Sequence, residues 1–288
     1  MTPLFGPAGN SLSYEAQGHK SMLEVPLYLV NNGLDAYEYQ GGHGIHITAE
    51  KASAFGEIAR EHNIALSIHA PYYISLSSVE EEKRNNSIGY ILESARAAKH
   101  MGATRVIIHS GSCSKITREQ ALSLVKDTLL KTIEVLDLEG LSNIILCPET
   151  MGKINQLGTV EEVMELCKLD ERFIPCIDFG HVNARTFGSL KTGDDFAAIL
   201  NCIENSLGES RLKVFHSHFS KIEYTLNGGE KRHLTFEDKL YGPDFEPVAE
   251  LIYKKNLSPV FICESAGTQA EDAFEMKRIY KKIAEGEK

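Results

Sequence analysis

Eight short apolar runs, rich in β-branched residues, recur along the chain and constrain its fold more than any other feature. They begin about 30 to 45 residues apart, and longer amphipathic segments separate them. Continuous apolar runs of this kind are typical of parallel strands that helices cover. The runs are Pro3 to Phe5, Leu34 to Tyr37, Ala65 to His69, Arg105 to His109, Asn143 to Pro148, Phe173 to Asp178, Lys213 to His218 and Pro259 to Glu264.

The intervening segments carry helix signals. Ser78, Thr117 and Thr159 are each followed three residues later by Glu or Gln, the spacing of a capping box. Apolar residues between Leu122 and Leu136 follow helical spacing. Eight βα units in 288 residues predict an α/β fold, a TIM (β/α)8 barrel, with a doubly wound open sheet as the alternative. Because no linker or repeat interrupts the pattern, we expect one domain over residues 1–288.

Composition and charge exclude several classes of protein. A chain with 42% hydrophobic and 24% charged residues is neither disordered nor collagenous. The net charge of -10 excludes a basic field over the whole molecule, although a local basic patch is compatible with it. Six cysteines without a C-x-x-C pair indicate reduced thiols. With neither a leader-like N-terminus nor a long apolar stretch, we expect a cytoplasmic protein that does not engage a membrane.

Six of the eight runs end at or next to a residue that can bind a metal ion. In a TIM barrel the carboxyl ends of the strands meet at one mouth, so these side chains would share one pocket. A buried group of imidazoles and carboxylates is costly unless a cation compensates it. One such histidine alone is more often an ordinary packed residue, and the set as a whole is what favours a metal centre. Ligands of this mixed type, without cysteine, suit zinc or manganese best. The residues are His69, His109, Glu149, Asp178, His181, His216, His218 and Glu264.

In the order of these motifs the sequence resembles the endonuclease IV family, which consists of zinc-dependent apurinic/apyrimidinic endonucleases built on a TIM barrel of the xylose-isomerase-like kind. The resemblance extends roughly from Ala65 to Ser265. It implies two or three Zn²⁺ per chain, with Mn²⁺ as a substitute. The ligands it implies are His69, His109 and Glu149 for the first ion; Glu149, Asp178, His218 and Glu264 for the second; and His181 and His233 for the third.

The chain departs from the family at two places. The family has an Asp two residues before the last histidine, but position 231 is Lys, and Glu230 is the nearest carboxylate. Either Glu230 reaches the third ion through a loop shifted by one residue, or that site is weak, or it is absent. The glycine-rich segment after the second run also lacks the Arg-bearing sequence that enters the duplex in the family. Substrate contacts are expected from Tyr72 by stacking and from Arg185 and Lys221 at phosphates, with Lys153, Lys231 and Arg232 as further loop cations.

The resemblance implies a metal-dependent phosphodiesterase that cleaves duplex DNA 5′ to an abasic site and acts in base excision repair. A hydroxide between two ions would attack phosphorus, Glu264 would orient or deprotonate the water, and Glu149 would set the metal spacing. We expect a monomer without an obligate protein partner. One alternative is a divalent-metal sugar isomerase or epimerase of the same barrel group, which needs only Glu149, Asp178, His218 and Glu264 around one metal. Another is a metal-binding barrel without catalysis.

Overall fold

Eight parallel strands form a closed barrel in the computed structural model, which describes residues 2–113 and 116–286. Their order is β1-β10-β7-β6 in one sheet and β2-β3-β4-β5 in the other. Parallel bridges between Ala8 and Glu38 and between Glu149 and Cys176 join the two sheets at both seams, so the open-sheet alternative is wrong. The strands are β1 Leu4–Pro7, β2 Ala36–Gln40, β3 Ala65–His69, β4 Arg105–Ile108, β5 Ile145–Pro148, β6 Cys176–Asp178, β7 His216–Phe219 and β10 Val260–Cys263.

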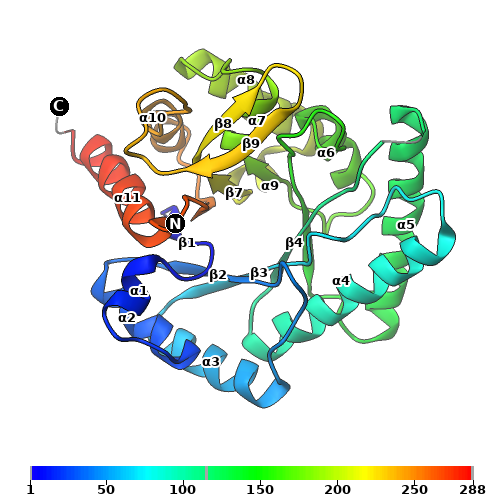
Figure 1. Ribbon diagram of the computed structural model, residues 1–288, viewed down its shortest axis with the longest axis horizontal. Helices are drawn as coiled ribbons and strands as arrows, with labels where there is room; N and C mark the ends of the chain where they lie inside the picture. Colours follow the sequence, from blue (N-terminus) through cyan, green and yellow to red (C-terminus); the bar gives the residue numbers. More distant parts are fainter. Residues whose placement is uncertain (1, 114–115, 287–288) are drawn as a thin grey trace.

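Helices surround the barrel (Figure 1). The predicted amphipathic helix between Leu122 and Leu136 is confirmed within α5, and its buried apolar residues belong to the hydrophobic core. The helices are α1 Leu12–Ala16, the 3₁₀ turn η1 Met22–Glu24, α2 Val25–Asn31, α3 Ala49–Glu61, α4 Glu81–Met101, α5 Arg118–Leu138, α6 Val160–Cys167, α7 Phe179–Arg185, α8 Gly193–Leu207, α9 Glu209–Lys213, α10 Glu246–Lys254 and α11 Gln269–Glu285.

Two of the three predicted capping boxes are confirmed. Thr117 caps α5 with Gln120, and Thr159 caps α6 with Glu162. The prediction at Ser78 is wrong, because α4 begins after Glu80 and Oγ of Ser78 accepts a hydrogen bond from the main-chain N–H of Glu80 instead. The two confirmed boxes fix where the helices begin after β4 and β5.

An antiparallel hairpin that the sequence analysis did not predict follows β7. It consists of β8 Lys221–Thr225 and β9 Gly229–Leu234, and it crosses the front of the barrel in the view of Figure 1. Main-chain hydrogen bonds join it to the loop after β5, from the N–H of Ile154 to the carbonyl of Gly228 and from the N–H of Glu230 to the carbonyl of Gly152. The hairpin therefore places its own side chains beside the carboxyl ends of the strands.

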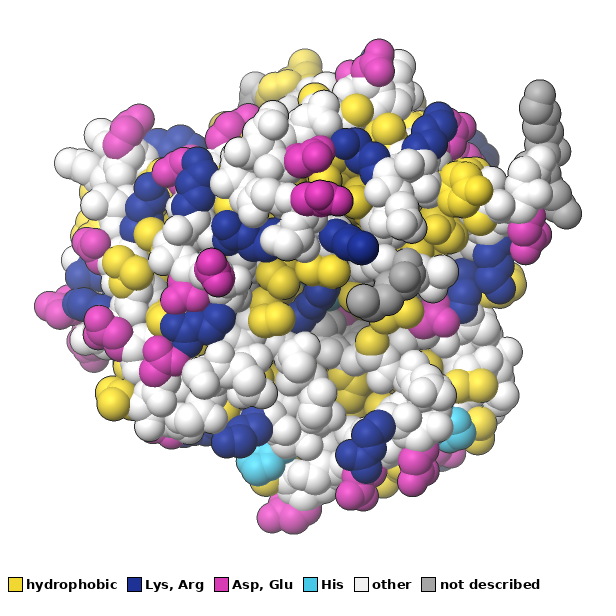
Figure 2. Space-filling model, turned by 180° about the vertical axis from the view of Figure 1, so that it is seen from behind, with side chains coloured by type: hydrophobic (Ala, Val, Ile, Leu, Met, Phe, Trp, Pro, Cys, Tyr) yellow, Lys and Arg dark blue, Asp and Glu magenta, His cyan; other side chains and the backbone are white. Residues whose placement is uncertain are grey.

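The opposite face of the molecule mixes charges of both signs around an apolar area (Figure 2). No large basic patch is visible on that face, which agrees with the negative net charge. Among the described residues, no helix has the length and apolar character that crossing a membrane requires.

Candidate metal centre

Glu149 lies at the centre of a cluster of histidines inside the barrel mouth. It follows β5 directly, and its side chain is 1% exposed. Its Oε2 lies 3.3 Å from Nε2 of His69 and 3.1 Å from Nε2 of His109. Its Oε1 lies 3.0 Å from Nδ1 of His218 and 3.3 Å from Nδ1 of His181. Four histidines from separate βα units thus contact one buried carboxylate. Glu149 and these four histidines form the first group of potential ligands.

A second group consists of four residues whose ligand atoms all lie within 4.8 Å of one another: Glu149, Asp178, His218 and Glu264. Oδ2 of Asp178 is buried and accepts no hydrogen bond, although Nδ1 of His181 lies 3.1 Å away. A buried carboxylate oxygen without a hydrogen bond is unfavourable unless another partner compensates it. These four side chains, which we call the quartet, therefore fit a divalent cation in both donor chemistry and spacing.

The third group contains His181, Glu230 and His233 within the same 4.8 Å limit. Nε2 of His181 lies 3.3 Å from Oε2 of Glu230. In a regular strand, residues 230 and 233 would point to opposite faces. In the hairpin, however, Tyr224 pairs with Glu230 and Glu223 pairs with Arg232, which leaves Lys231 as the extra residue of a β-bulge. The bulge turns Glu230 to the side of His233, so the geometry is that of the first of the three alternatives, a shift by one residue, whereas binding of a third ion stays a prediction.

Burial and the nearby histidines together set the pKa values of the carboxyl groups in the cluster. Burial opposes ionisation of Glu149, but the charge of His218 and hydrogen bonds from His109 and His181 outweigh it and hold the pKa of Glu149 well below its usual range. Burial likewise opposes ionisation of Glu264, and the charges of His218 and His233 outweigh it and lower its pKa. Burial instead raises the pKa of Asp178 to about 6. Of these three carboxylates, Asp178 is therefore the last to ionise as the pH rises.

Protein stripped of divalent ions with a chelator is expected to lose stability as the pH rises from about 6.5 to about 9. Burial opposes protonation of His69, but its hydrogen bond and charge interaction with Glu149 outweigh this and raise its pKa to about 9. The folded state then binds more protons than the unfolded chain, in which a histidine has a pKa of about 6.5. His69 alone should therefore lower the free energy of unfolding by about 3 kcal/mol across this window, and His181 and His218, whose pKa values are raised as well, act in the same direction.

Urea unfolding at pH 6.5 and at pH 9 measures this difference, and H69Q should show a smaller fall than the unmodified chain. A free energy of unfolding that stays level or rises with pH would show that His69 is not charged in the folded state.

The opening of the cluster is formed by its more exposed members. The side chains of Glu264, His109 and His233 are 15%, 17% and 26% exposed, whereas those of Asp178 and His218 are fully buried. Glu264 connects the second and third groups, because its two oxygens lie 3.6 Å from Nδ1 of His218 and 4.0 Å from Nδ1 of His233. A molecule entering the mouth therefore meets Glu264 before it meets Glu149.

Tyr72, the predicted stacking residue, lies on the surface beside the mouth. It is 56% exposed, its N–H donates to the carbonyl of Gly42, and its ring packs edge to face against His43. The loops after β2 and β3 therefore lie together, and the ring of Tyr72 is accessible. Its contact with a substrate stays a prediction.

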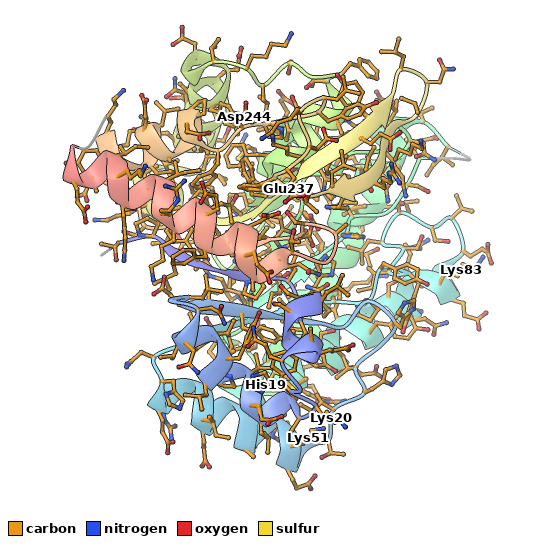
Figure 3. All side chains as sticks on the ribbon, turned by 60° about the vertical axis from the view of Figure 1, so that its left-hand side comes forward. His19, Lys20, Lys51, Lys83, Glu237 and Asp244 are labelled. Carbon is orange, nitrogen blue, oxygen red and sulfur yellow. The ribbon has the colours of Figure 1, made fainter. Side chains whose placement is uncertain are left out.

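The two predicted cationic substrate contacts have partners within the protein. Nζ of Lys221 is buried, donates to the carbonyl of Asp238 and lies 3.1 Å from Oδ1 of Asp244, on the segment between β9 and α10 that Figure 3 shows. The guanidinium of Arg185 fastens the loop after β5 by donating to the carbonyls of Met151, Lys153, Ile154 and Gln156. Both residues shape the surroundings of the cluster, and their role in substrate binding stays a prediction.

Sequence reasoning missed Glu38, a carboxylate on β2 that is fully buried in the barrel interior. Its Oε2 lies 3.0 Å from Nε2 of His216, and its Oε1 lies 2.9 Å from Nε2 of His218. The predicted second run ended at Tyr37, one residue before Glu38 and three residues before the end of β2. Glu38 would have stood out as an inward-facing acid had the alternation of β2 been followed to Gln40.

Comparison with known proteins supports the same type of fold. A protein from Methanocaldococcus jannaschii, the uncharacterized protein MJ0133, is 32% identical over 274 residues, which cover 95% of this chain and 96% of that protein. A "Probable endonuclease 4" from Mycoplasma pneumoniae is 26% identical and covers 84% of this chain and 79% of its own length.

Two solved structures show the same fold at low sequence identity. Endonuclease IV from Thermus thermophilus superimposes with a TM-score of 0.68 at 16% identity, covering 99% of this chain and 100% of that one. A D-tagatose 3-epimerase-like protein superimposes with a TM-score of 0.73 at 20% identity, covering 99% and 98%. The model of the xylose isomerase-like TIM barrel matches residues 27–282. The chain therefore belongs to the xylose isomerase-like TIM barrel family.

Proposed function

We propose that this protein is a metal-dependent phosphodiesterase that cleaves duplex DNA 5′ to abasic sites. The proposal depends mainly on one observation: three adjoining groups of potential ligands lie at one mouth of the barrel. Glu149 belongs to the first and second groups. The third group adjoins Glu149 through His181. A reaction that uses one ion needs only the quartet. His69, His109, His181, His233 and Glu230 would then be a surplus, and burial of His69 and His181 without an ion would be costly.

The side chains divide into a buried set and an accessible set. Glu149, Asp178 and His218 lie at the bottom, where burial keeps their positions fixed and excludes water. Bound Zn²⁺ or Mn²⁺ ions would neutralise the phosphate and make water acidic enough to react near neutral pH. Glu264 is ionised and reaches the opening, so it can accept the proton of an attacking water molecule.

The surface near the opening offers contacts for a nucleic acid. Lys153 is exposed on the loop after β5, and the side chains of Lys231 and Arg232 on β9 are 55% and 68% exposed. Both hairpin cations also pair with Glu223, which limits their contribution. Phosphate contacts from a few such side chains would give binding that weakens steeply with salt.

A sugar epimerase is the second candidate, and two observations favour it. The quartet is complete by itself, as a one-metal isomerase of this barrel group would require. The negative net charge also suits a neutral sugar better than a polyanion. This candidate assigns the third group of ligands to contacts with substrate hydroxyls.

Incubation of Zn²⁺- or Mn²⁺-loaded protein with an abasic-site duplex tests the proposal. We expect strand incision 5′ to the abasic site, its loss on addition of a chelator, and a fall of at least about 100-fold in E264Q, because an amide cannot accept the proton. E250Q, on the exposed face of α10, is the matched control and should retain full activity. Absence of incision together with epimerisation of a ketohexose such as D-tagatose would favour the second candidate.

A further inference from the structure

The interior of the barrel below the quartet is unusually polar. Branched apolar side chains normally fill this space in TIM barrels, but here it contains Glu38, which the proposed reaction does not use. Oε2 of Glu38 accepts a hydrogen bond of 2.8 Å from the hydroxyl of Ser67 and one of 3.0 Å from His216. A fully buried carboxylate is costly, and these partners reduce that cost.

Both ring nitrogens of His218 face carboxylates. Nδ1 faces the quartet, where Glu149 and Glu264 lie 3.0 and 3.6 Å away. Nε2 points to the interior and lies 2.9 Å from Oε1 of Glu38, within ion-pair distance, although it makes no hydrogen bond of regular geometry with any described residue. A neutral imidazole that binds a cation through Nδ1 must carry its proton on Nε2. The carboxylate of Glu38 is the charged group next to Nε2, and its negative charge favours this tautomer.

The neighbouring His216 is held in the tautomer that donates to Glu38. Nη1 of Arg105 lies 3.4 Å from Nδ1 of His216, and Nη2 donates to the carbonyl of Val214. A guanidinium can only donate hydrogen bonds, so Nδ1 of His216 accepts and its Nε2 carries the proton. Arg105, His216 and Ser67 thereby keep the carboxylate of Glu38 in place under His218.

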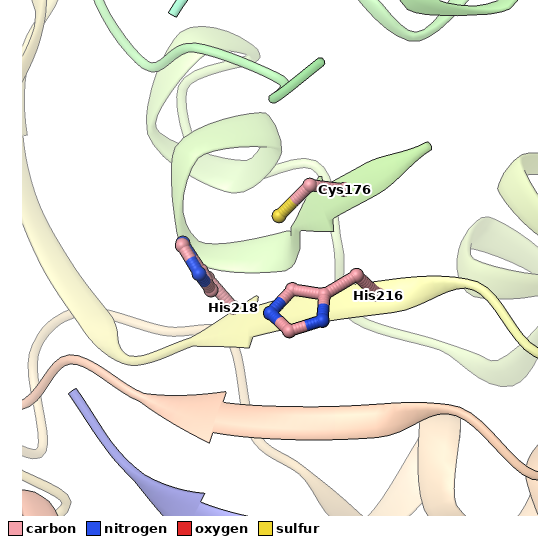
Figure 4. Close-up of side chains that lie close together, drawn as sticks. All are labelled: Cys176, His216 and His218. Atoms are coloured by element: carbon pink, nitrogen blue, oxygen red, sulfur yellow. The ribbon is translucent and has the colours of Figure 1, made fainter. Parts of the chain in front are cut away.

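Cys176 lies beside both histidines, as Figure 4 shows, and the three side chains form a buried group with the spacing of metal ligands. A separate ion at that point would require His216 to give up either Arg105 or Glu38. The positive charge of Arg105 and the negative charge of Glu38 already compensate each other across His216. The contacts therefore favour a supporting role for this region over a further ion.

We propose that Glu38 is a positioning residue that orients His218 and thereby sets the affinity of the quartet for its divalent ion. The inference rests on the proposed function in one respect, namely that the quartet binds a divalent ion. Carboxylates that accept the distal N–H of a metal-binding histidine typically contribute 10- to 100-fold to metal affinity.

Titration of the full-length, metal-free protein with Co²⁺, followed by visible absorption, tests this role. We expect E38Q to bind Co²⁺ about 10- to 100-fold more weakly and to show an altered visible spectrum. E38D should also bind more weakly, because it retains the charge but withdraws the carboxylate from His218. E57Q, which makes the same change at an exposed residue of α3, is the matched control and should leave the affinity unchanged.

The alternative outcomes are distinct. Unchanged Co²⁺ affinity and spectrum in E38Q and E38D, with only a lower melting temperature, would overturn the inference and leave the proposed function intact. A wild-type protein that binds no Co²⁺ would overturn both.

Discussion

Replacement of Glu149 by glutamine should lower the number of bound divalent ions to at most one per chain and abolish incision of an abasic-site duplex. Glu149 is the carboxylate that the first and second groups share, and four histidines lie within 3.3 Å of its oxygens. An amide offers one neutral oxygen in place of two charged ones. Loss of metal charge at the phosphate is worth several kcal/mol, so we expect the rate to fall at least about 10³-fold.

Metal analysis of dialysed protein and a gel-based incision assay measure the two effects in E149Q. E165Q is the matched control, because Glu165 lies on α6 and pairs with Lys126 and Lys168 at the surface. It should retain the ion content and rate of the unmodified chain. An E149Q protein that is folded and retains its ions would show that Glu149 is not the shared ligand.

Replacement of Gly6 by alanine should destabilise the barrel strongly. A Cβ atom at Gly6 would lie 1.8 Å from the carbonyl oxygen of Ala36, which belongs to the neighbouring β2. The atoms that would clash with this Cβ belong to the main chain of Ala36 and cannot rotate away, so strands β1 and β2 would have to separate. We expect a loss of about 3 kcal/mol or more and a melting temperature at least about 6 °C lower. Glu38 lies on the same seam, opposite Ala8, so metal affinity should fall as well.

Thermal unfolding followed by circular dichroism measures the effect of G6A. G89A is the matched control, because Gly89 lies within α4 and a Cβ there would meet no atom within 4 Å. Alanine at that position should raise the stability by about 0.5 to 1 kcal/mol. Equal melting temperatures for G6A and the unmodified chain would contradict the close approach of β1 and β2.

The strands were predictable because each has its own local signal. Runs such as Ala65 to His69 and Arg105 to His109 are apolar, short and bounded by helical patterns, and both coincide with strands in the structure. The sequence also predicts that the residues at the strand ends share one pocket, because the carboxyl ends of barrel strands converge. Convergence of the strand ends predicts that Glu149 lies near the histidines, but it gives neither the distances nor the ring nitrogens that face Glu149.

The hairpin and Glu38 were not predictable in the same way. β8 and β9 are polar and lie outside the barrel wall, so they lack the apolar run that marks the other strands. The turn signal at Asn227 to Gly229 was available, but the bulge at Lys231 that turns Glu230 toward His233 depends on pairing across the hairpin. Glu38 gains its importance from His216 and His218, which lie far from it in sequence.

Anomalous diffraction from crystals of the zinc-loaded protein tests the central claim most directly, because it locates each ion relative to Glu149. We predict at least two peaks beside the carboxylate of Glu149, one near His69 and His109 and one within the quartet. We further predict a third peak between His181, Glu230 and His233. Crystals with no ion in contact with Glu149, or with these side chains turned away from one another, would contradict the account.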